Sequence, residues 1–328
     1  MFLCRELMDS VKKYLTALKY VMAGLFLVMT TGFVLIIITV VIHFPYDVDA
    51  PLTHQEIEAA HKYYTEAYRK PVTENQERSE YETKYIRVAE AAANEFRIEE
   101  QVSAFVKQFN LSDQPVLEIG SGRGYLQDVA QNYTGLDISP SVARFYHKKF
   151  VLGSATTMPF SDNSFAAIWS IWVFEHVPNP EQAFREARRV TRDKGLLFLF
   201  PAWNCTSWAA AGYEVRSYAD FGLMGKLVKA SIPLRSSQLF KVMTLVPIRV
   251  IRHLAAQSGP TRLRYRRLNP NYEEYWVRDS DAVNSIDSHE AMLWFLSRGD
   301  ECLNCGDASV FLPLTAMPLI IRVNMTAG

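Results

Sequence analysis

The longest hydrophobic stretch of the chain lies near its start. No Asp, Glu, Lys or Arg occurs between Tyr20 and Tyr46. A helix needs about 20 apolar residues to cross the hydrocarbon core of a bilayer, so this stretch predicts a transmembrane helix over residues 20–44, after a flank of residues 1–19. A cleaved signal peptide has a shorter apolar region, and a helix of a soluble core shows a polar face. An uncleaved anchor is therefore the preferred interpretation.

A polar, glutamate-rich region follows and is typical of helices. Thr53 and Glu56 have the spacing of a capping box, which opens a helix, and Pro71 separates two helical stretches. Between Ile86 and Phe96 apolar residues recur at helical spacing. The pattern predicts a helical arm over residues 53–110 that packs one face on the main domain.

Short apolar runs then alternate with helical patterns. Such alternation predicts a parallel α/β sheet with helices on both faces, that is, a Rossmann-like, doubly wound fold over residues 111–204. The expected strands are Val116–Ile119, Thr134–Ile138, Ala166–Ser170 and Leu196–Phe200, and the expected helices are Tyr125–Asn132 and Asn179–Arg192.

The last part of the chain, residues 275–328, is expected to complete a mostly parallel sheet of seven strands. Residues 275–278 are a candidate sixth strand, residues 288–297 a helix, and residues 301–304 an antiparallel edge strand. The apolar tail 310–323 contains two prolines and has no assigned place.

The segment Pro115-Val-Leu-Glu-Ile-Gly-Ser-Gly-Arg-Gly-Tyr carries the clearest chemical signal. Glycines directly after a buried strand let the backbone turn sharply and approach a ligand closely. Their GxGxG spacing differs from the GxGxxG of dinucleotide folds. A second strand ends in Asp137, and an acid at that position can accept hydrogen bonds from ribose hydroxyls.

These motifs together resemble one family. VLEIGSGRGY, GLDIS, MPFSDNSF, EHVPNPEQAFREARRV and GLLFLF occur in an order and spacing similar to those of class I S-adenosylmethionine (SAM)-dependent methyltransferases, and most closely the small-molecule subfamily that includes quinone-biosynthesis C-methyltransferases. The match covers about residues 114–202. It implies SAM as cofactor and leaves the methyl acceptor open.

The resemblance also implies a role for individual residues. The three glycines would pass beneath the methionine part of SAM, Glu118 would lie near its amino group, and Asp137 would hold the ribose. The family usually has Asp where Ser154 stands, so the adenine contact would lack charge assistance here. The implied cofactor residues are Glu118, Gly120, Gly122, Gly124, Asp137, Ile138, Ser154, Ala155 and Met158.

His176 is the leading catalytic candidate. It follows the fourth strand, at the sheet edge where ligands bind in open α/β folds, and its side chain titrates near neutral pH. A base is required only if the acceptor must lose a proton. A histidine that merely packs locally is the alternative.

Residues 205–274 form a long insertion after the fifth strand. No acidic residue occurs between Phe221 and Tyr272, and ten Lys and Arg residues are interleaved with apolar clusters. This pattern predicts a basic amphipathic lid on an anionic membrane surface. A solvated helical insertion is the alternative, and nucleic acid is disfavoured because aromatic residues are few and the chain is neutral.

Composition narrows the remaining classes. Hydrophobic residues make up 49%, and 35 basic residues balance 35 acidic ones, which excludes a disordered chain. Four cysteines exclude a disulfide scaffold. Cys302 and Cys305 have CxxC spacing, but no second pair completes a zinc site, so free thiols and no metal are expected.

The sequence thus predicts a membrane-anchored, SAM-dependent methyltransferase of a lipophilic or membrane-associated small molecule or lipid. Two alternatives stay open: a tethered methyltransferase of a protein or soluble metabolite, and a non-catalytic membrane adaptor. Sidedness is in conflict. Lys and Arg before the span place the main domain outside, whereas use of SAM, a cytosolic cofactor, places it in the cytoplasm, which we prefer. The oligomeric state is not predicted.

Overall fold

The computed structural model describes residues 2–43, 53–69, 80–256, 259–272, 277–305, 311–312 and 317–325. It divides into two compact units, residues 1–44 and residues 45–328.

The first unit is one long helix, α1 (Phe2–His43). Its segment Lys12–Leu35 is long and apolar enough to cross a membrane. Large apolar side chains along it are exposed, among them Phe26 and Met29. A signal sequence near an N-terminus can also meet this criterion of length and composition. The helix therefore agrees with the predicted span but begins earlier, within the predicted flank.

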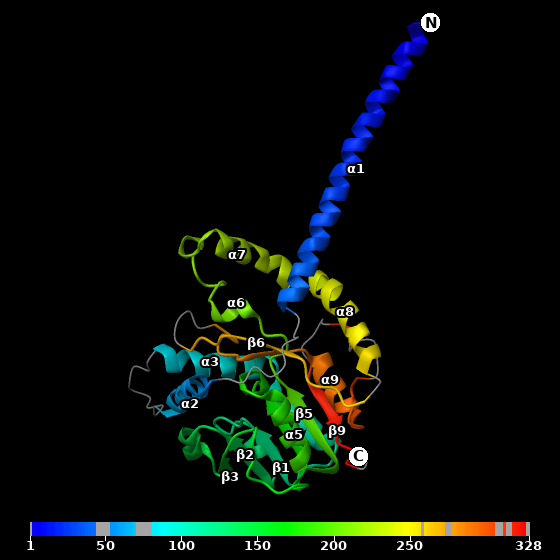
Figure 1. The fold of residues 1–328 in the computed structure, drawn as a ribbon. Coiled ribbons are helices and arrows are strands. Elements are labelled where there is room, and N and C mark those ends of the chain that lie inside the picture. Colours follow the sequence, from blue (N-terminus) through cyan, green and yellow to red (C-terminus); the bar gives the residue numbers. More distant parts are fainter. Residues whose placement is uncertain are drawn as a thin grey trace. The chain divides into compact units, whose positions relative to one another are not determined.

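The second unit is built on a seven-stranded sheet in the order β3-β2-β1-β4-β5-β9-β8 (Figure 1). Strands β1 to β5 are parallel, and β9 runs antiparallel to both of its neighbours. This confirms the predicted Rossmann-like fold. The strands are β1 (Val116–Ile119), β2 (Tyr133–Asp137), β3 (Lys149–Leu152), β4 (Phe165–Ile171), β5 (Thr191–Phe200), β8 (Glu301–Cys302) and β9 (Leu319–Arg322).

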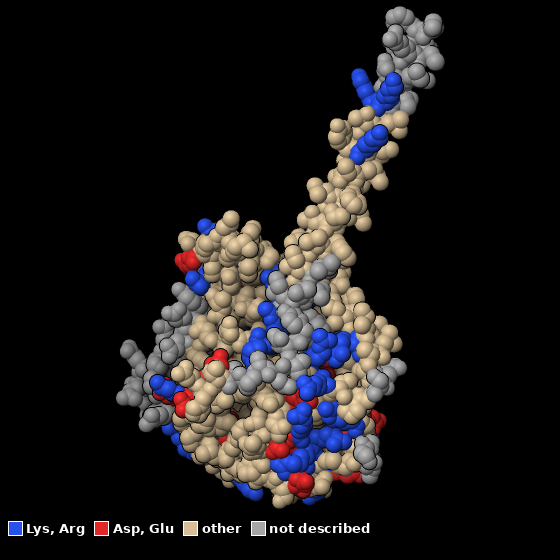
Figure 2. Space-filling view, viewed as in Figure 1, with Lys and Arg blue, Asp and Glu red and all other residues tan. Residues whose placement is uncertain are grey.

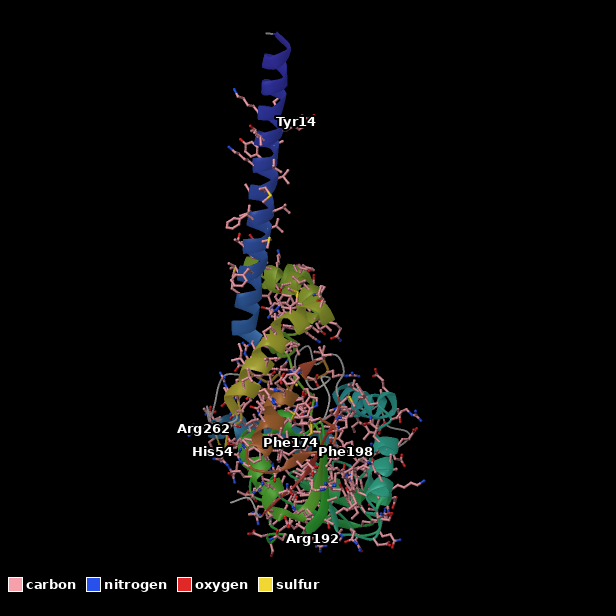
Figure 3. All side chains as sticks on the ribbon, turned by 90° about the vertical axis from the view of Figure 1, so that its right-hand side faces the viewer. Tyr14, His54, Phe174, Arg192, Phe198 and Arg262 are labelled. Atoms are coloured by element: carbon pink, nitrogen blue, oxygen red, sulfur yellow. A yellow bond between two sulfur atoms is a disulfide. The ribbon has the colours of Figure 1, made fainter. Side chains whose placement is uncertain are left out.

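Alternate residues of the central strands enter two different cores. Leu117, Ile168 and Leu197 pack on one face with helices α5 (Pro180–Val190) and α9 (Ser288–Leu296). The neighbouring residues, such as Val116, Ala167 and Phe198, pack on the other face with α4 (Ile98–Gln108). A sheet buried on both faces needs continuous apolar strands, which explains the runs in the sequence. Figure 3 labels Phe174, which belongs to the first of these cores, and Phe198, which belongs to the second.

The arm consists of α2 (His54–Arg69) and α3 (Glu80–Glu95), which lead into α4. The predicted capping box is present at its start. The backbone N–H of Thr53 donates to Glu56 Oε2 at 2.7 Å, and the N–H of Glu56 donates to Thr53 Oγ1 at 3.3 Å. Pro71 lies outside the described residues.

The insertion after β5 contains α6 (Ser207–Ala210), α7 (Leu223–Ser236) and α8 (Gln238–Ala255). A separate two-stranded sheet, β6 (Tyr265–Arg267) with β7 (Asn284–Ile286), returns the chain to the core. Short 3-10 turns fill the remaining connections: η1 (Gln127–Val129), η2 (Pro140–Phe145), η3 (Phe174–His176) and η4 (Tyr218–Asp220).

One predicted helix is wrong, and one predicted strand lies partly outside the described residues. The helix expected over Tyr125–Asn132 is only the turn η1, because hydrogen bonds between residues three apart tighten the chain after Gly124, and the Gln127 side chain bonds to the carbonyl of Phe145. The expected strand 275–278 is absent from the described part: residues 273–276 are not described, and Arg278 lies in a turn.

The apolar tail supplies the missing strand instead. Residues 319–322 form β9, which pairs with β5 between Leu196 and Leu199 and also pairs with β8. The expected antiparallel edge strand is thus confirmed in part, as β8. The structure also pairs Cys302 with Cys305 in a disulfide, against the expectation of free thiols, because the turn after β8 brings their Cα atoms to 5.5 Å. Cys205 is free and buried.

Candidate active site

The candidate site lies at the carboxyl edge of the sheet, where the strand order reverses between β1 and β4. Loops on the two sides of such a switch point diverge and leave a crevice, and this is where open α/β sheets bind ligands. Two cavities occupy the region. One has a volume of about 330 Å³ and the other about 420 Å³.

The first cavity contains most of the predicted cofactor residues and the catalytic candidate. They come from the ends of β1, β2, β3 and β4, which meet at this edge. The predicted residues that line it are Gly120, Asp137, Ile138, Ser154, Ala155 and His176.

The second cavity lies on the other side of the glycine turn. Its lining includes Glu118, Gly120 and Gly122. Tyr68, Gly120 and Trp172 line both cavities, so these three residues mark where the two spaces meet. A long ligand with two chemically different halves could therefore occupy both.

Gly120 must be a glycine for two reasons. Its φ of +69° is a backbone conformation that other residues rarely adopt. A Cβ built on it would also lie 2.2 Å from Cγ2 of Val173, which follows β4. The close approach of the β1 and β4 loops therefore depends on the missing side chain.

Gly124 and Met158 are predicted cofactor residues that line neither cavity. Gly124 packs against the ring of Tyr146, whose hydroxyl donates to the carbonyl of Gly122 at 3.0 Å. The side chain of Met158 is buried in the core beneath the cavity, and its backbone N–H donates to Glu186. The structure therefore gives both residues a supporting position.

Asp137 ends β2 and holds the glycine turn. Its Oδ2 accepts from the N–H of Gly122 at 2.9 Å, and its Oδ1 accepts from the N–H of Ser139 at 2.8 Å. Burial raises the pKa of Asp137, while these backbone hydrogen bonds act in the opposite direction. Each carboxylate oxygen can accept a further bond, so the residue can bind a hydroxyl pair while it supports the loop.

Glu118 is the buried acid of the second cavity. It accepts a short hydrogen bond from the hydroxyl of Tyr133. Burial raises its pKa to about 8, although the bond from Tyr133 lowers it. A cation bound beside Glu118 would favour its charged form, so this carboxyl suits a positively charged ligand group.

His176 lines the first cavity and lies between two acids. Its Nδ1 is 3.7 Å from Asp281 Oδ2 and 3.3 Å from the backbone carbonyl of Asp281, and its Nε2 is 3.6 Å from Glu175 Oε1. Burial lowers the pKa of His176, but the carboxylates of Asp281 and Glu175 outweigh this and raise it. Asp281 also accepts from the hydroxyl of Tyr64 at 3.0 Å, which ties α2 to the same cluster.

Sequence reasoning missed the contribution of α2. One face of this helix lines the first cavity with Ile57, Ala60, His61, Tyr64 and Tyr68. The arm is fastened to the η2 turn by two bonds to its backbone carbonyls, from the Ser141 side chain at 2.9 Å and from that of Arg144 at 2.7 Å. Apolar periodicity in α2 indicates a buried face but not what that face covers.

Trp172 was also missed. It is a non-glycine residue with a φ of +54°, a conformation that clusters at functional sites. Its N–H donates to the carbonyl of Phe200 at 2.8 Å, which fixes this backbone beside the carboxyl end of β5. Nothing in the local sequence around Trp172 indicates a positive φ.

Comparison with known proteins agrees with this geometry. Residues 117–199 match the family described as "Methyltransferase domain". The chain is 26% identical to a fatty-acid O-methyltransferase of Mycolicibacterium smegmatis over 51% of this chain and 68% of that protein. It is 35% identical to a ubiquinone/menaquinone biosynthesis C-methyltransferase of Hahella chejuensis over 24% of this chain and 32% of that protein.

A solved SAM-dependent methyltransferase from Aquifex aeolicus is 18% identical and superimposes with a TM-score of 0.28, covering 31% of this chain and 63% of that one. The family match together with the sheet and its glycine turn identifies residues 117–199 as a methyltransferase domain. The class predicted from the sequence is thereby confirmed.

Proposed function

We propose that the chain is a membrane-anchored SAM-dependent methyltransferase whose acceptor is a lipophilic small molecule or lipid. The observation that carries the cofactor assignment is the meeting of two cavities at Gly120, with Asp137 in the first and Glu118 in the second. These residues fit the two halves of SAM. Asp137 would hold the ribose hydroxyls, Ser154 and Ala155 would lie beside the adenine, and Glu118 would neutralise the amino group.

When bound, SAM supplies a methyl group on a positively charged sulfur, which a nucleophilic acceptor atom takes by in-line displacement. Positioning then provides much of the rate. Tyr68, Gly120 and Trp172 surround the junction of the cavities and would orient the reacting groups. At a pH above the raised pKa of His176, its neutral imidazole would remove a proton from the acceptor. Asp281 would keep the imidazole ring in place.

The lipophilic acceptor is inferred from three features. The first cavity has apolar walls beyond the cofactor residues, from Ile57, Ala60, Val173 and Val177. Helix α1 would keep the domain beside a bilayer. Two relatives bear names that refer to fatty acids and to ubiquinone/menaquinone biosynthesis, and these compounds are lipophilic.

Calorimetric titration of the full-length protein in detergent with SAM tests the cofactor assignment. Asp137→Asn should weaken binding at least tenfold, because it removes the charge that would hold the ribose. Asp113→Asn, at an exposed acid outside both cavities, should bind like the wild type. No binding by the folded wild type would overturn the enzyme function and favour a non-catalytic adaptor.

The acceptor class needs a second assay. The protein is incubated with methyl-tritiated SAM and a total lipid extract, and the label is followed by phase partition. Label in the organic phase, reduced in His176→Gln, is expected. Label only in protein or in the aqueous phase would contradict a lipid acceptor and favour the tethered methyltransferase of a protein or soluble metabolite.

We further propose that the methyltransferase domain faces the cytoplasm, where SAM is made. Lys12, Lys13 and Lys19 before the apolar stretch favour the opposite orientation. A reporter fused to the C-terminus, active on one side of the membrane only, distinguishes the two orientations. A lumenal or external signal would contradict the proposed side.

A further inference from the structure

Helices α7 and α8 follow one another with a bend at Ser237, and this α7–α8 pair has an inverted distribution of side chains. They contact each other and are separated only by Ser237, whose Oγ caps α8 by accepting from the N–H of Phe240 at 3.3 Å. Figure 1 shows both helices at one end of the domain, far from β1 to β3.

The outer surface of the α7–α8 pair is apolar. Large exposed apolar residues lie at most seven positions apart along each helix, and exposed Ala230 and Pro247 fill the two longest gaps, so each helix presents one continuous stripe. Leu223, Leu239 and Ile251 are 76%, 73% and 66% exposed. The apolar stripe, as we name it, consists of Leu223, Met224, Leu227 and Leu234 on α7 and Leu239, Met243, Val250, Ile251 and Leu254 on α8.

Most Lys and Arg residues of the same helices are partly or fully buried instead, and only Lys226 among them is exposed. Arg249 is buried and binds Asp287 at 2.8 Å, and Arg252 binds Glu290 at 2.7 Å, both near the start of α9. The ammonium group of Lys229 donates to the carbonyl of Tyr213. The basic face expected on an anionic membrane is therefore largely turned inward, and Figure 2 shows the outer surface of α7 and α8 mostly in the colour of uncharged residues.

An exposed stripe of this size needs a partner, because soluble proteins rarely leave large contiguous apolar patches in water. The chain itself points to a bilayer. Only residues 44–52 separate α1 from Thr53, and nine residues span about 30 Å at most. If α1 crosses a membrane, the domain stays within reach of its surface.

The insertion also borders the candidate site at both of its ends. It leaves the sheet after Phe200, at the carboxyl end of β5, on the same edge as the cavities. After β6 the chain returns at Asp281, beside His176, and the N–H of Val283 donates to the carbonyl of Glu175 at 2.9 Å. An element bound to lipid would thus be connected directly to the loops that line the site.

We propose that the apolar stripe of α7 and α8 lies in the interfacial layer of the bilayer, held by apolar burial rather than by attraction of basic residues to anionic lipid. This deepens the proposed function and rests on its membrane anchor. The docked α7–α8 pair would hold the site next to the membrane, where a lipophilic acceptor is concentrated.

Spin labels report the position of the stripe in the full-length protein in nanodiscs. In a Cys4→Ser background, single cysteines replace Leu239, Met243 or Ile251, and a control cysteine replaces Arg192, which Figure 3 labels at the opposite end of the domain from α7 and α8. Labels on the stripe should collide with oxygen several-fold more often than with a water-soluble nickel chelate. The control label should show the reverse order.

The lipid composition and two matched variants identify the driving contact. Neutral and anionic nanodiscs should give the same result. Leu239→Gln with Ile251→Gln should expose the label at position 243 to nickel, whereas Lys226→Gln should leave it in lipid.

Three results would overturn the proposal: stripe labels as accessible to nickel as the control, burial only in anionic discs, or labels shielded from both reagents with spin–spin broadening, which indicates a second copy of the chain. SAM binding is measured in the same discs. Its loss with the stripe in lipid would overturn the proposed function alone, and its retention with an exposed stripe would overturn the docking alone.

Discussion

The glycine turn and the α7–α8 pair place their polar groups in opposite ways. At the glycine turn, the acids Asp137 and Glu118 border the cavities together with apolar side chains such as Val173. In the α7–α8 pair, apolar side chains are exposed, and charged groups such as Arg249 are buried against α9. The first arrangement suits a small polar ligand, and the second suits an apolar surface. Five predictions test this difference, from the largest expected effect to the smallest.

Arg249→Met should destabilise the fold most. Asp287, fully buried, would lose the partner that holds its pKa low, and an uncompensated buried charge costs about 3–5 kcal/mol. Denaturant unfolding of the full-length protein in detergent measures the change. Lys226→Met, at an exposed position on α7, should alter stability by less than about 0.5 kcal/mol. Equal effects of the two substitutions would mean that the charges of the α7–α8 pair are not turned inward.

Gly120→Ala should damage the cofactor side. The positive φ costs about 1–2 kcal/mol for a residue with a Cβ, and the collision with Val173 about 1–3 kcal/mol more. SAM affinity should fall at least tenfold in the same titration. Gly222→Ala is the matched control on α7, because the φ of Gly222 is −66° and no atom lies within 4 Å of the added Cβ. It should leave SAM affinity unchanged, although alanine is a poorer N-cap than glycine. Normal SAM binding by Gly120→Ala would contradict the close approach of the two loops.

The pH dependence of SAM binding should report Glu118. Its pKa of about 8 means that it is mostly neutral at pH 6, whereas the amino group of SAM needs the carboxylate. Affinity should therefore rise about tenfold from pH 6 to pH 7 and level off above pH 8. Glu118→Gln should bind more weakly at pH 8 and lose this slope; an unchanged slope would assign it to another group.

The free energy of unfolding should depend on pH in the opposite direction from SAM affinity: it should fall as the pH rises. A carboxyl with a pKa raised on folding stabilises the fold below its unfolded value of 4.5, and that contribution is lost as the pH rises to about 8. Glu118→Gln should therefore lose less stability than the wild type between pH 5 and pH 8.

The smallest effect is expected for the apolar stripe in detergent. Leu239→Gln and Ile251→Gln remove exposed side chains that pack little within the domain, so each should change stability by less than about 0.5 kcal/mol. Losses similar to that of Arg249→Met would show that these residues belong to the core and would contradict the proposed inverted distribution.

Much of the cofactor side could be predicted because its signals are local. The glycines, Asp137 and the apolar strands lie within short segments whose spacing fixes a strand, a turn and the next strand. Seven of the nine predicted cofactor residues line a cavity, as does His176. Gly124 and Met158 could not be told apart from the others, because a supporting residue next to a site has the same sequence spacing as a contact residue.

The sequence by itself thus determined the class of fold, the long apolar helix and the turn at which SAM would bind. Only the tertiary structure decided that α2 covers the first cavity, that the apolar tail forms β9 beside β5, and that most basic residues of α7 and α8, such as Arg249, face inward. Each of these depends on contacts between residues far apart in the chain, such as Tyr64 with Asp281 and Arg249 with Asp287. Periodicity shows that a helix has two faces, but the partners that bury one of them are chosen by the packing of the whole domain.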